Sequence, residues 1–390
     1  MTARRIIVIL IALLIGVQIV RNAAVLAFAG SKPEVAERVW KDHPAAEISS
    51  AMTQIAVAAR NRRPVPAAAF SMIGDAARKD PLAPEPFLVR GVQAELAGKG
   101  AVVQKAFEAA QWRDPRSLAA AYFLADRYFR TGDSERGLRE VAALARLAPN
   151  GPVVVGPYLA AYAANPVNWT ALRNLLRANP MLADQTLTAL AAHAETVPAL
   201  LALADPRSGS VTWLPSLLNT LTAAGKYGQA RAIWARMSHA QGGSDQLIYD
   251  SSFSDRTSPP PFNWTLTSST VGLAERQPGG RLHVLFYGQE DGFLASELLL
   301  LTPGAYRLSM QLLGDPSRAH NLNWSIWCDK AGEPIASITL DAAAALGWRF
   351  EVPKACPAQW LKLSGVSGDV PQQTDITIGS LKLEKAGPGA

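Results

Sequence analysis

The residue types that do chemistry in enzymes are present in this sequence, but not at the spacings that catalysis requires. Its five histidines are scattered, with none at the i, i+4 spacing of a zinc-protease helix. Gly365-Val366-Ser367-Gly368 has the wrong spacing for a nucleophile elbow. The neighbouring carboxylates Glu290 and Asp291 would serve glycoside hydrolysis only with a partner carboxylate across a cleft. We therefore predict no catalytic residues, no metal and no cofactor, and keep a carbohydrate-active envelope enzyme as the weakest alternative.

Aromatic residues at alternating positions point instead to binding. In the C-terminal part apolar residues recur with a period of two, so one face of each expected strand is buried and the other is wet. Two tryptophans fall on the wet face among polar groups, which suits sugars, because flat C–H faces stack on aromatic rings. The predicted saccharide-binding residues are Trp327, Trp360, Tyr287, Asn323, Gln311 and Arg307. The alternative is that these aromatic rings pack against the helical part of the chain.

Short strands bounded by turn residues would carry these side chains. Gly242-Gly243-Ser244 and Ser258-Pro259-Pro260-Pro261 interrupt the helical pattern, and turn signals recur at short intervals beyond them. We predict a jelly-roll-like antiparallel β-sandwich over 263–386, preceded by a linker at 246–262. Its expected strands are 262–267, 281–287, 293–301, 305–313, 322–329, 335–340, 347–352, 359–364 and 376–384.

The chain contains only two cysteines, Cys328 and Cys356, and both lie in the predicted sandwich. Two cysteines without nearby histidines give a metal too few ligands, and an exported chain meets an oxidising compartment. We predict a Cys328–Cys356 disulfide that contributes on the order of 3 kcal/mol.

The N-terminal part repeats a helical pattern. Pro81, Pro115 and Pro149 stand 34 residues apart, and each ends an apolar helical stretch. This period is the length of a helix–turn–helix repeat, and such repeats stack into a solenoid with a concave groove. We predict a helical repeat domain, an α-solenoid, over 31–245, with the period lost between 150 and 210.

Positions inside these units resemble the tetratricopeptide repeat. Small residues let paired helices approach, and aromatic residues fill the space between them. The matching residues are Phe87, Gly91, Phe107, Ala110 and Pro115 in one unit and Ala125, Tyr128 and Pro149 in the next, while Gly137, Leu144 and Arg90 depart from the pattern. The resemblance covers 84–149 well and 50–83 loosely, and it returns at 213–234. It implies a protein partner in the solenoid groove.

A second resemblance lies in the C-terminal part. Its residues are Pro261-Phe262-x-Trp264, Leu282-x-Val284-x-Phe286-x-Gly288, Leu301-x-Pro303-Gly304-x-Tyr306-x-Leu308, Trp324-x-Ile326-x-Cys328 and Cys356-Pro357-Ala358-Gln359-Trp360-Leu361. This layout resembles C-terminal modules of exported repeat proteins of proteobacteria, which look like carbohydrate-binding jelly rolls. The resemblance implies work in envelope or exopolysaccharide assembly.

Residues 1–30 read as an export signal. Arg4 and Arg5 precede an apolar run from Ile6 to Val20, shorter than the roughly 20 residues of a full bilayer crossing. The basic residues before the run place the N-terminus in the cytoplasm and the remainder outside it. We favour a retained single-pass anchor in a bacterial inner membrane, with the bulk of the chain periplasmic. The alternative is cleavage after Ala27-Phe28-Ala29 and release into the periplasm.

Charge is divided unevenly along the chain. Residues 1–248 contain 27 Lys and Arg against 18 Asp and Glu (27 − 18 = +9), and the total is +6, so the remainder carries −3. Export, and the lack of a recognition motif, argue against nucleic acid as a partner. We predict a non-enzymatic, membrane-anchored periplasmic adaptor that binds a protein through its repeats and a polysaccharide through its sandwich. The first alternative is an assembly factor that binds protein only.

Overall fold

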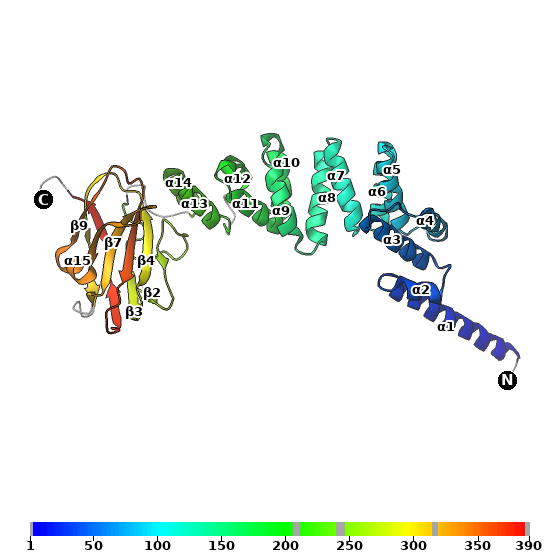
Figure 1. The fold of residues 1–390 in the computed structure, drawn as a ribbon, viewed down its shortest axis with the longest axis horizontal. Coiled ribbons are helices and arrows are strands. Elements are labelled where there is room, and N and C mark those ends of the chain that lie inside the picture. Colours follow the sequence, from blue (N-terminus) through cyan, green and yellow to red (C-terminus); the bar gives the residue numbers. More distant parts are fainter. Residues whose placement is uncertain (1–2, 206–210, 239–245, 314–318, 387–390) are drawn as a thin grey trace. The chain divides into compact units, whose positions relative to one another are not determined.

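Helices occupy the first part of the chain and antiparallel sheets the last part, as Figure 1 shows, which confirms the predicted order. The computed structural model describes residues 3–205, 211–238, 246–313 and 319–386. Its helices are α1 (Ala3–Ala29), α2 (Pro33–Val39), α3 (Pro44–Arg60), α4 (Ala67–Lys79), α5 (Glu85–Leu96), α6 (Gly100–Arg113), α7 (Leu118–Arg130), α8 (Ser134–Leu147), α9 (Gly151–Tyr162), α10 (Trp169–Ala178), α11 (Pro180–Ala191), α12 (Val197–Leu203), α13 (Leu214–Ala223), α14 (Tyr227–Met237) and α15 (Leu340–Leu346). Its strands are β1 (Thr265–Leu266), β2 (Gly272–Gln277), β3 (Arg281–Phe286), β4 (Gly292–Leu299), β5 (Gly304–Ser309), β6 (Leu312–Leu313), β7 (Leu322–Cys328), β8 (Pro334–Thr339), β9 (Trp348–Val352), β10 (Gln359–Gly365), β11 (Thr374–Ile378) and β12 (Lys382–Lys385).

The chain forms two compact units whose division does not follow the change from helix to strand. The first unit contains Met1–Val155 and Thr170–Leu182, and the second contains Gly156–Trp169 and Ala183–Ala390. Helices α12, α13 and α14 therefore belong to the same unit as the strands. The predicted boundaries at residues 30, 245 and 262 stay predictions.

Helical hairpins build the first unit, and their packing follows the small-and-aromatic pattern of the sequence. In the pair α5 and α6, a Cβ added at Gly91 would lie 2.6 Å from the ring of Phe107, so only glycine admits this ring. The next pair, α7 and α8, starts each helix with a capping side chain: Ser117 accepts from Ala120 N and Asp133 from Arg136 N. The expected close approach of helices at Gly91 is thus confirmed, while the tetratricopeptide family remains a resemblance.

Two layers of strands enclose one apolar core in the second unit. A five-stranded sheet has the order β1-β4-β10-β7-β8. The other strands pair as β2-β3-β11-β6 and β12-β5-β9. These two sheets form one layer. Strand β5 continues into β6 and strand β11 continues into β12. In one sheet β6 pairs with β11, and in the other β5 pairs with β12. Side chains from all three sheets, including Phe286, Trp324 and Trp348, meet in a single buried cluster.

The expected strands match this arrangement with three differences. Strand β2 was not predicted, because Gly272–Gln277 contains three polar residues at its exposed end. The predicted strand 305–313 is broken at residues 310–311 into β5 and β6, and 376–384 is broken at 379–381 into β11 and β12. Both breaks occur where the second layer bends, and Gly379 N donates to Gln311 O there at 2.8 Å.

The segment 246–262, predicted as a linker, packs tightly between α14 and the strands. Its Ile248 and Phe253 belong to the core of the sandwich. Trp234 of α14 is 1% exposed and donates from its ring nitrogen to Pro259 O at 2.7 Å. Beside it the Arg231 guanidinium lies 4.5 Å from the Trp234 ring centroid. The last helical hairpin and the sandwich are therefore packed as one body.

Candidate functional site

The outer face of the five-stranded sheet carries a group of aromatic and cationic side chains. Strands β4, β10 and β7 lie side by side and contribute Phe293, Lys362 and Trp327. The Lys362 Nζ atom lies 4.4 Å from the Phe293 ring centroid and 4.7 Å from that of Trp327. The two rings meet edge to face at 6.4 Å. We call these three residues the aromatic clamp.

Polar groups of β7 border the aromatic clamp. Trp327 donates from its ring nitrogen to Ser325 Oγ at 2.8 Å, which fixes the orientation of the indole. Two residues further along, Asn323 shares this face and pairs in register with Ser364 of β10. Its buried Oδ1 atom finds no hydrogen-bond donor among the residues that the structure describes. A buried acceptor without a partner costs about 1–3 kcal/mol.

Burial changes the chemistry of Lys362. Burial lowers the pKa of this ammonium, and the charge of Asp329 only partly offsets the effect. The ammonium is held against two rings, where cation–π attraction favours the charged form. The clamp therefore offers a stacking surface and a cation together, and Phe293 leaves 47% of its surface exposed at the open end of this face.

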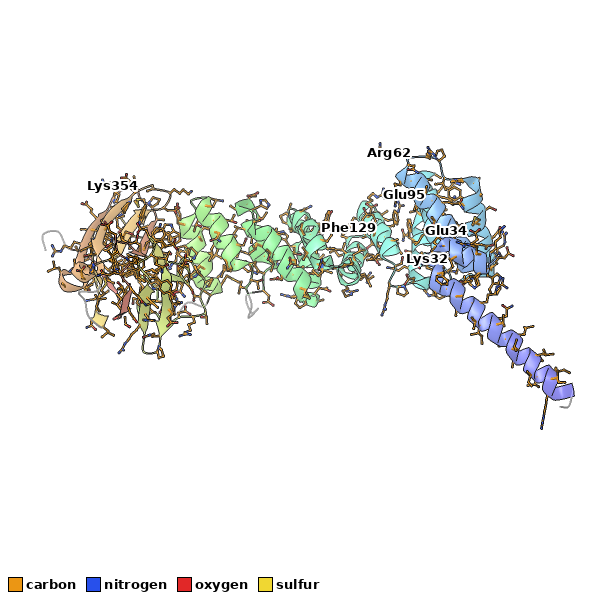
Figure 2. The ribbon with its side chains drawn as sticks, turned by 60° about the horizontal axis from the view of Figure 1, so that its bottom comes forward. Lys32, Glu34, Arg62, Glu95, Phe129 and Lys354 are labelled. Carbon is orange, nitrogen blue, oxygen red and sulfur yellow. A yellow bond between two sulfur atoms is a disulfide. The ribbon has the colours of Figure 1, made fainter. Side chains whose placement is uncertain are left out.

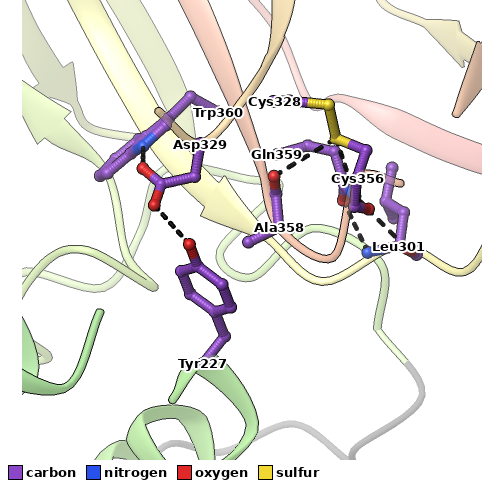
Figure 3. The surroundings of a disulfide bond; sticks show 8 residues. All are labelled: Tyr227, Leu301, Cys328, Asp329, Cys356, Ala358, Gln359 and Trp360. Carbon is purple, nitrogen blue, oxygen red and sulfur yellow. Dashed lines mark hydrogen bonds between the residues drawn. A yellow bond between two sulfur atoms is a disulfide. The ribbon is translucent and has the colours of Figure 1, made fainter. Parts of the chain in front are cut away.

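Trp360 lies beside Trp327 on the same face, as its partner on the neighbouring strand, and is engaged within the unit. Its ring nitrogen donates to Asp329 Oδ1 at 2.9 Å, and the Tyr227 hydroxyl of α14 donates to Asp329 Oδ2 at 2.5 Å (Figure 3). Burial and the hydrogen bond to Asp329 raise the pKa of Tyr227 to about 12. Asp329 thus links Trp360 of the sheet to Tyr227 of α14.

The predicted disulfide between Cys328 and Cys356 is confirmed, and it ties the end of β7 to the loop that precedes β10. Next to it the fully buried Gln359 accepts from Leu301 N at 2.8 Å and donates to Cys356 O at 2.6 Å (Figure 3). Trp327 and Trp360 pair in register on these strands. The bridge and the Gln359 side chain therefore hold both tryptophans at fixed positions.

The structure gathers three of the six predicted saccharide-binding residues and separates the others. Trp327, Trp360 and Asn323 share the outer face of the five-stranded sheet. The remaining three belong to the second layer: Tyr287 follows β3, Gln311 lies between β5 and β6, and Arg307 on β5 donates to Leu346 O at 3.1 Å. Phe293 and Lys362 were missed, although both lie in predicted strands, at 293–301 and 359–364.

Two groups that the sequence offers for chemistry, Asp291 and His283, are engaged locally. Asp291 Oδ1 accepts from the backbone and the hydroxyl of Ser367, at 2.7 and 2.6 Å. His283 contacts Asp375 through Nε2 and Glu275 through Nδ1, at 2.9 and 3.2 Å, so the two carboxylates lie on opposite sides of the ring. Among the described residues, no three His, Cys, Asp or Glu side chains are arranged to hold a metal ion.

His283 provides a pH test of the second layer. Burial lowers the pKa of its imidazole. The hydrogen bonds to Asp375 and Glu275, together with the charges of these carboxylates, raise the pKa by more than burial lowers it, so the net shift is upward from 6.5. Its protonated form stabilises the fold fully below pH 6.5, and the contribution is lost as the pH rises through the higher folded pKa. We expect His283→Gln to lower the free energy of unfolding by about 0.5–1 kcal/mol at pH 5.5 and much less at pH 9.

Urea titrations at the two pH values measure this difference, and the exposed His193 changed to Gln is the control. An equal loss at both pH values would show that the ion pairs do not act.

Comparisons with known proteins do not place the chain in a family. No family model and no curated protein matches it. A solved structure, accessory secretory protein 1, 2 and 3 of Streptococcus pneumoniae, is similar over 31% of this chain and 89% of that chain, at 12% identity and a TM-score of 0.24. At that score the likeness carries no argument about function.

Proposed function

We propose that the protein is a non-enzymatic, membrane-anchored binding protein of the bacterial periplasm whose sandwich binds a saccharide at the aromatic clamp. The observation that carries this proposal is the Lys362 ammonium held against the rings of Phe293 and Trp327 on the outer face of the sheet. Sugar rings present flat C–H faces to aromatic residues and hydroxyls to polar groups. Polysaccharide assembly at the cell envelope is the process in which such an adaptor would act.

The proposed site is smaller than the set predicted from sequence. It keeps Trp327 and Asn323, adds Phe293 and Lys362, and assigns Trp360 to packing, since its ring nitrogen already binds Asp329. The cation favours acidic saccharides over neutral ones. The aromatic clamp would bind its ligand through a surface that is already organised before the ligand arrives, and no covalent bond is made or broken.

A titration with soluble polysaccharide, followed by tryptophan fluorescence, tests the site. We expect alginate, an acidic polymer, to change the fluorescence more than neutral dextran does. Trp327→Ala should weaken binding about tenfold, which corresponds to about 1.4 kcal/mol. Trp112→Ala is the matched control, because that indole is 73% exposed on α6 of the first unit. An unaltered response in Trp327→Ala would contradict the site.

A second function, which does not exclude the first, is capture of a protein partner by the helical unit. Exposed aromatic and apolar side chains favour it: Trp112 is 73%, Tyr122 63% and Leu96 86% exposed. Aromatic residues are enriched at protein interfaces. If neither polysaccharide binds, the alternative of an assembly factor that contacts only proteins becomes the better proposal.

A further inference from the structure

Helix α1 has two parts that meet different surroundings. The large apolar side chains from Ile6 to Val20 expose 46–69% of their surface, whereas Val25 exposes 0%. Figure 2 shows side chains standing out from α1 on several sides, and Lys32 and Glu34 at the turn into α2. In the described part of the chain, α1 is the one straight helix long and apolar enough to span a membrane. Only its first part, however, lacks protein around it.

The second part of α1 is packed into the helical unit. Val25 forms an apolar cluster with Ala36 of α2 and Ala46 of α3. The Ser49 hydroxyl donates to the carbonyl of Ala29, the last residue of α1. The predicted cleavage site at 27–29 is therefore helical, with Phe28 and Ala29 half-buried and Ala27 exposed, whereas proteolysis acts on flexible chain.

Polar and aromatic side chains from the turn between α2 and α3 contact α1 where the exposed apolar run ends. The Arg21 guanidinium lies 4.4 Å from the Trp40 ring centroid, and its Nε donates to Val39 O at 3.0 Å. One residue later, Asn22 Oδ1 contacts His43 Nε2 at 2.8 Å. Helix α2 reverses the chain and returns Trp40 to this level, beside Gln18, Ile19 and Asn22. Tryptophan and arginine are the residues that mark a membrane–water interface.

We propose that the membrane surface crosses α1 at Arg21, that Trp40 inserts into the lipid headgroup region there, and that α1 is retained as a rigid extension of the helical unit. The bilayer is the occupant because Ile6–Val20 presents apolar side chains on all sides. This run is about 22 Å long at about 1.5 Å per residue, shorter than a hydrocarbon core of roughly 30 Å. Snorkelling of Arg5 and Arg21 and local thinning make up such a difference.

Single-cysteine labelling of the full chain in phosphatidylglycerol–phosphatidylcholine liposomes tests this boundary, which rests on the membrane anchorage in the proposed function. The native chain has no free thiol, since its two cysteines form the disulfide. We expect a charged maleimide to label Leu26→Cys as fast as Leu96→Cys, and Leu13→Cys roughly tenfold slower or less, until detergent removes the bilayer.

Protection of Leu26→Cys would overturn the boundary at Arg21 and leave the anchor intact. Rapid labelling of Leu13→Cys would overturn the anchorage itself. Mass spectrometry of the chain isolated from bacterial membranes should find residues before Ala29, and their absence would overturn retention. For Trp40, lipids brominated near the headgroup should quench the fluorescence of the native protein more than that of Trp40→Phe; equal quenching would place this indole outside the interface.

Discussion

Replacing Trp234 with alanine is expected to lower the free energy of unfolding of the strand-containing unit by about 3–5 kcal/mol. This tryptophan connects α14 to the sandwich. Its ring packs edge to face on Tyr249 at 4.7 Å and on Phe262 at 5.8 Å, and its nitrogen binds Pro259 O. The truncation also removes the surface on which the half-buried Arg231 guanidinium rests. Without these contacts, α14 loses its packing against the segment 246–262, which itself contributes to the sandwich core.

Urea denaturation of the detergent-solubilised chain, followed by near-ultraviolet circular dichroism, measures this loss. Trp112→Ala should change the free energy of unfolding by less than about 0.5 kcal/mol, since that indole is exposed. Trp234→Phe should fall between the two, because it keeps ring contacts and loses the hydrogen bond. A loss below about 1 kcal/mol in Trp234→Ala would mean that the helical hairpin does not depend on this ring.

Removing the disulfide is expected to have the next largest effect. Cys328 and Cys356 are 28 residues apart, and closing a loop of that length stabilises a fold by about 3–4 kcal/mol. Replacing both cysteines with alanine should lower the free energy of unfolding by that amount. It should also weaken alginate binding, because the bridge holds the end of β7, where Trp327 lies.

The comparison of native protein with and without dithiothreitol provides the measurement. The double alanine variant is the control, because its urea midpoint should not respond to reductant. If thiol titration shows both cysteines reduced and the native midpoint stays unchanged, the bridge contributes nothing to stability.

Much of this architecture follows from local sequence patterns. Period-two alternation predicted that one face of each strand is buried, and Leu282, Val284 and Phe286 of β3 are fully buried. The pairing of Cys328 with Cys356 was predicted because the chain contains only these two cysteines. Glycine at a helix–helix contact, as at Gly91, also follows from steric limits that act between neighbouring helices. Such features depend on residues that are close in sequence, or, for the disulfide, on there being only one possible pair of cysteines.

The composition of the site depended instead on how distant strands pair. The sequence indicates that Arg307, Gln311 and Trp327 face outward, but not that they lie on different layers. Lys362 and Phe293 become neighbours only because β10 pairs with β4, through a register shift at Leu363. Likewise, no local pattern indicates that residues 246–262 fill the junction with α14.

The central claim is that the aromatic clamp binds a saccharide, and a glycan array carrying neutral and acidic bacterial oligosaccharides tests it most directly. The native chain and the Phe293→Ala/Trp327→Ala variant are compared on the same array, after circular dichroism has shown that both are folded. The account predicts that the native chain retains at least one acidic glycan and that the variant loses it. Binding of no glycan by the native chain, or equal binding by both proteins, would contradict the claim.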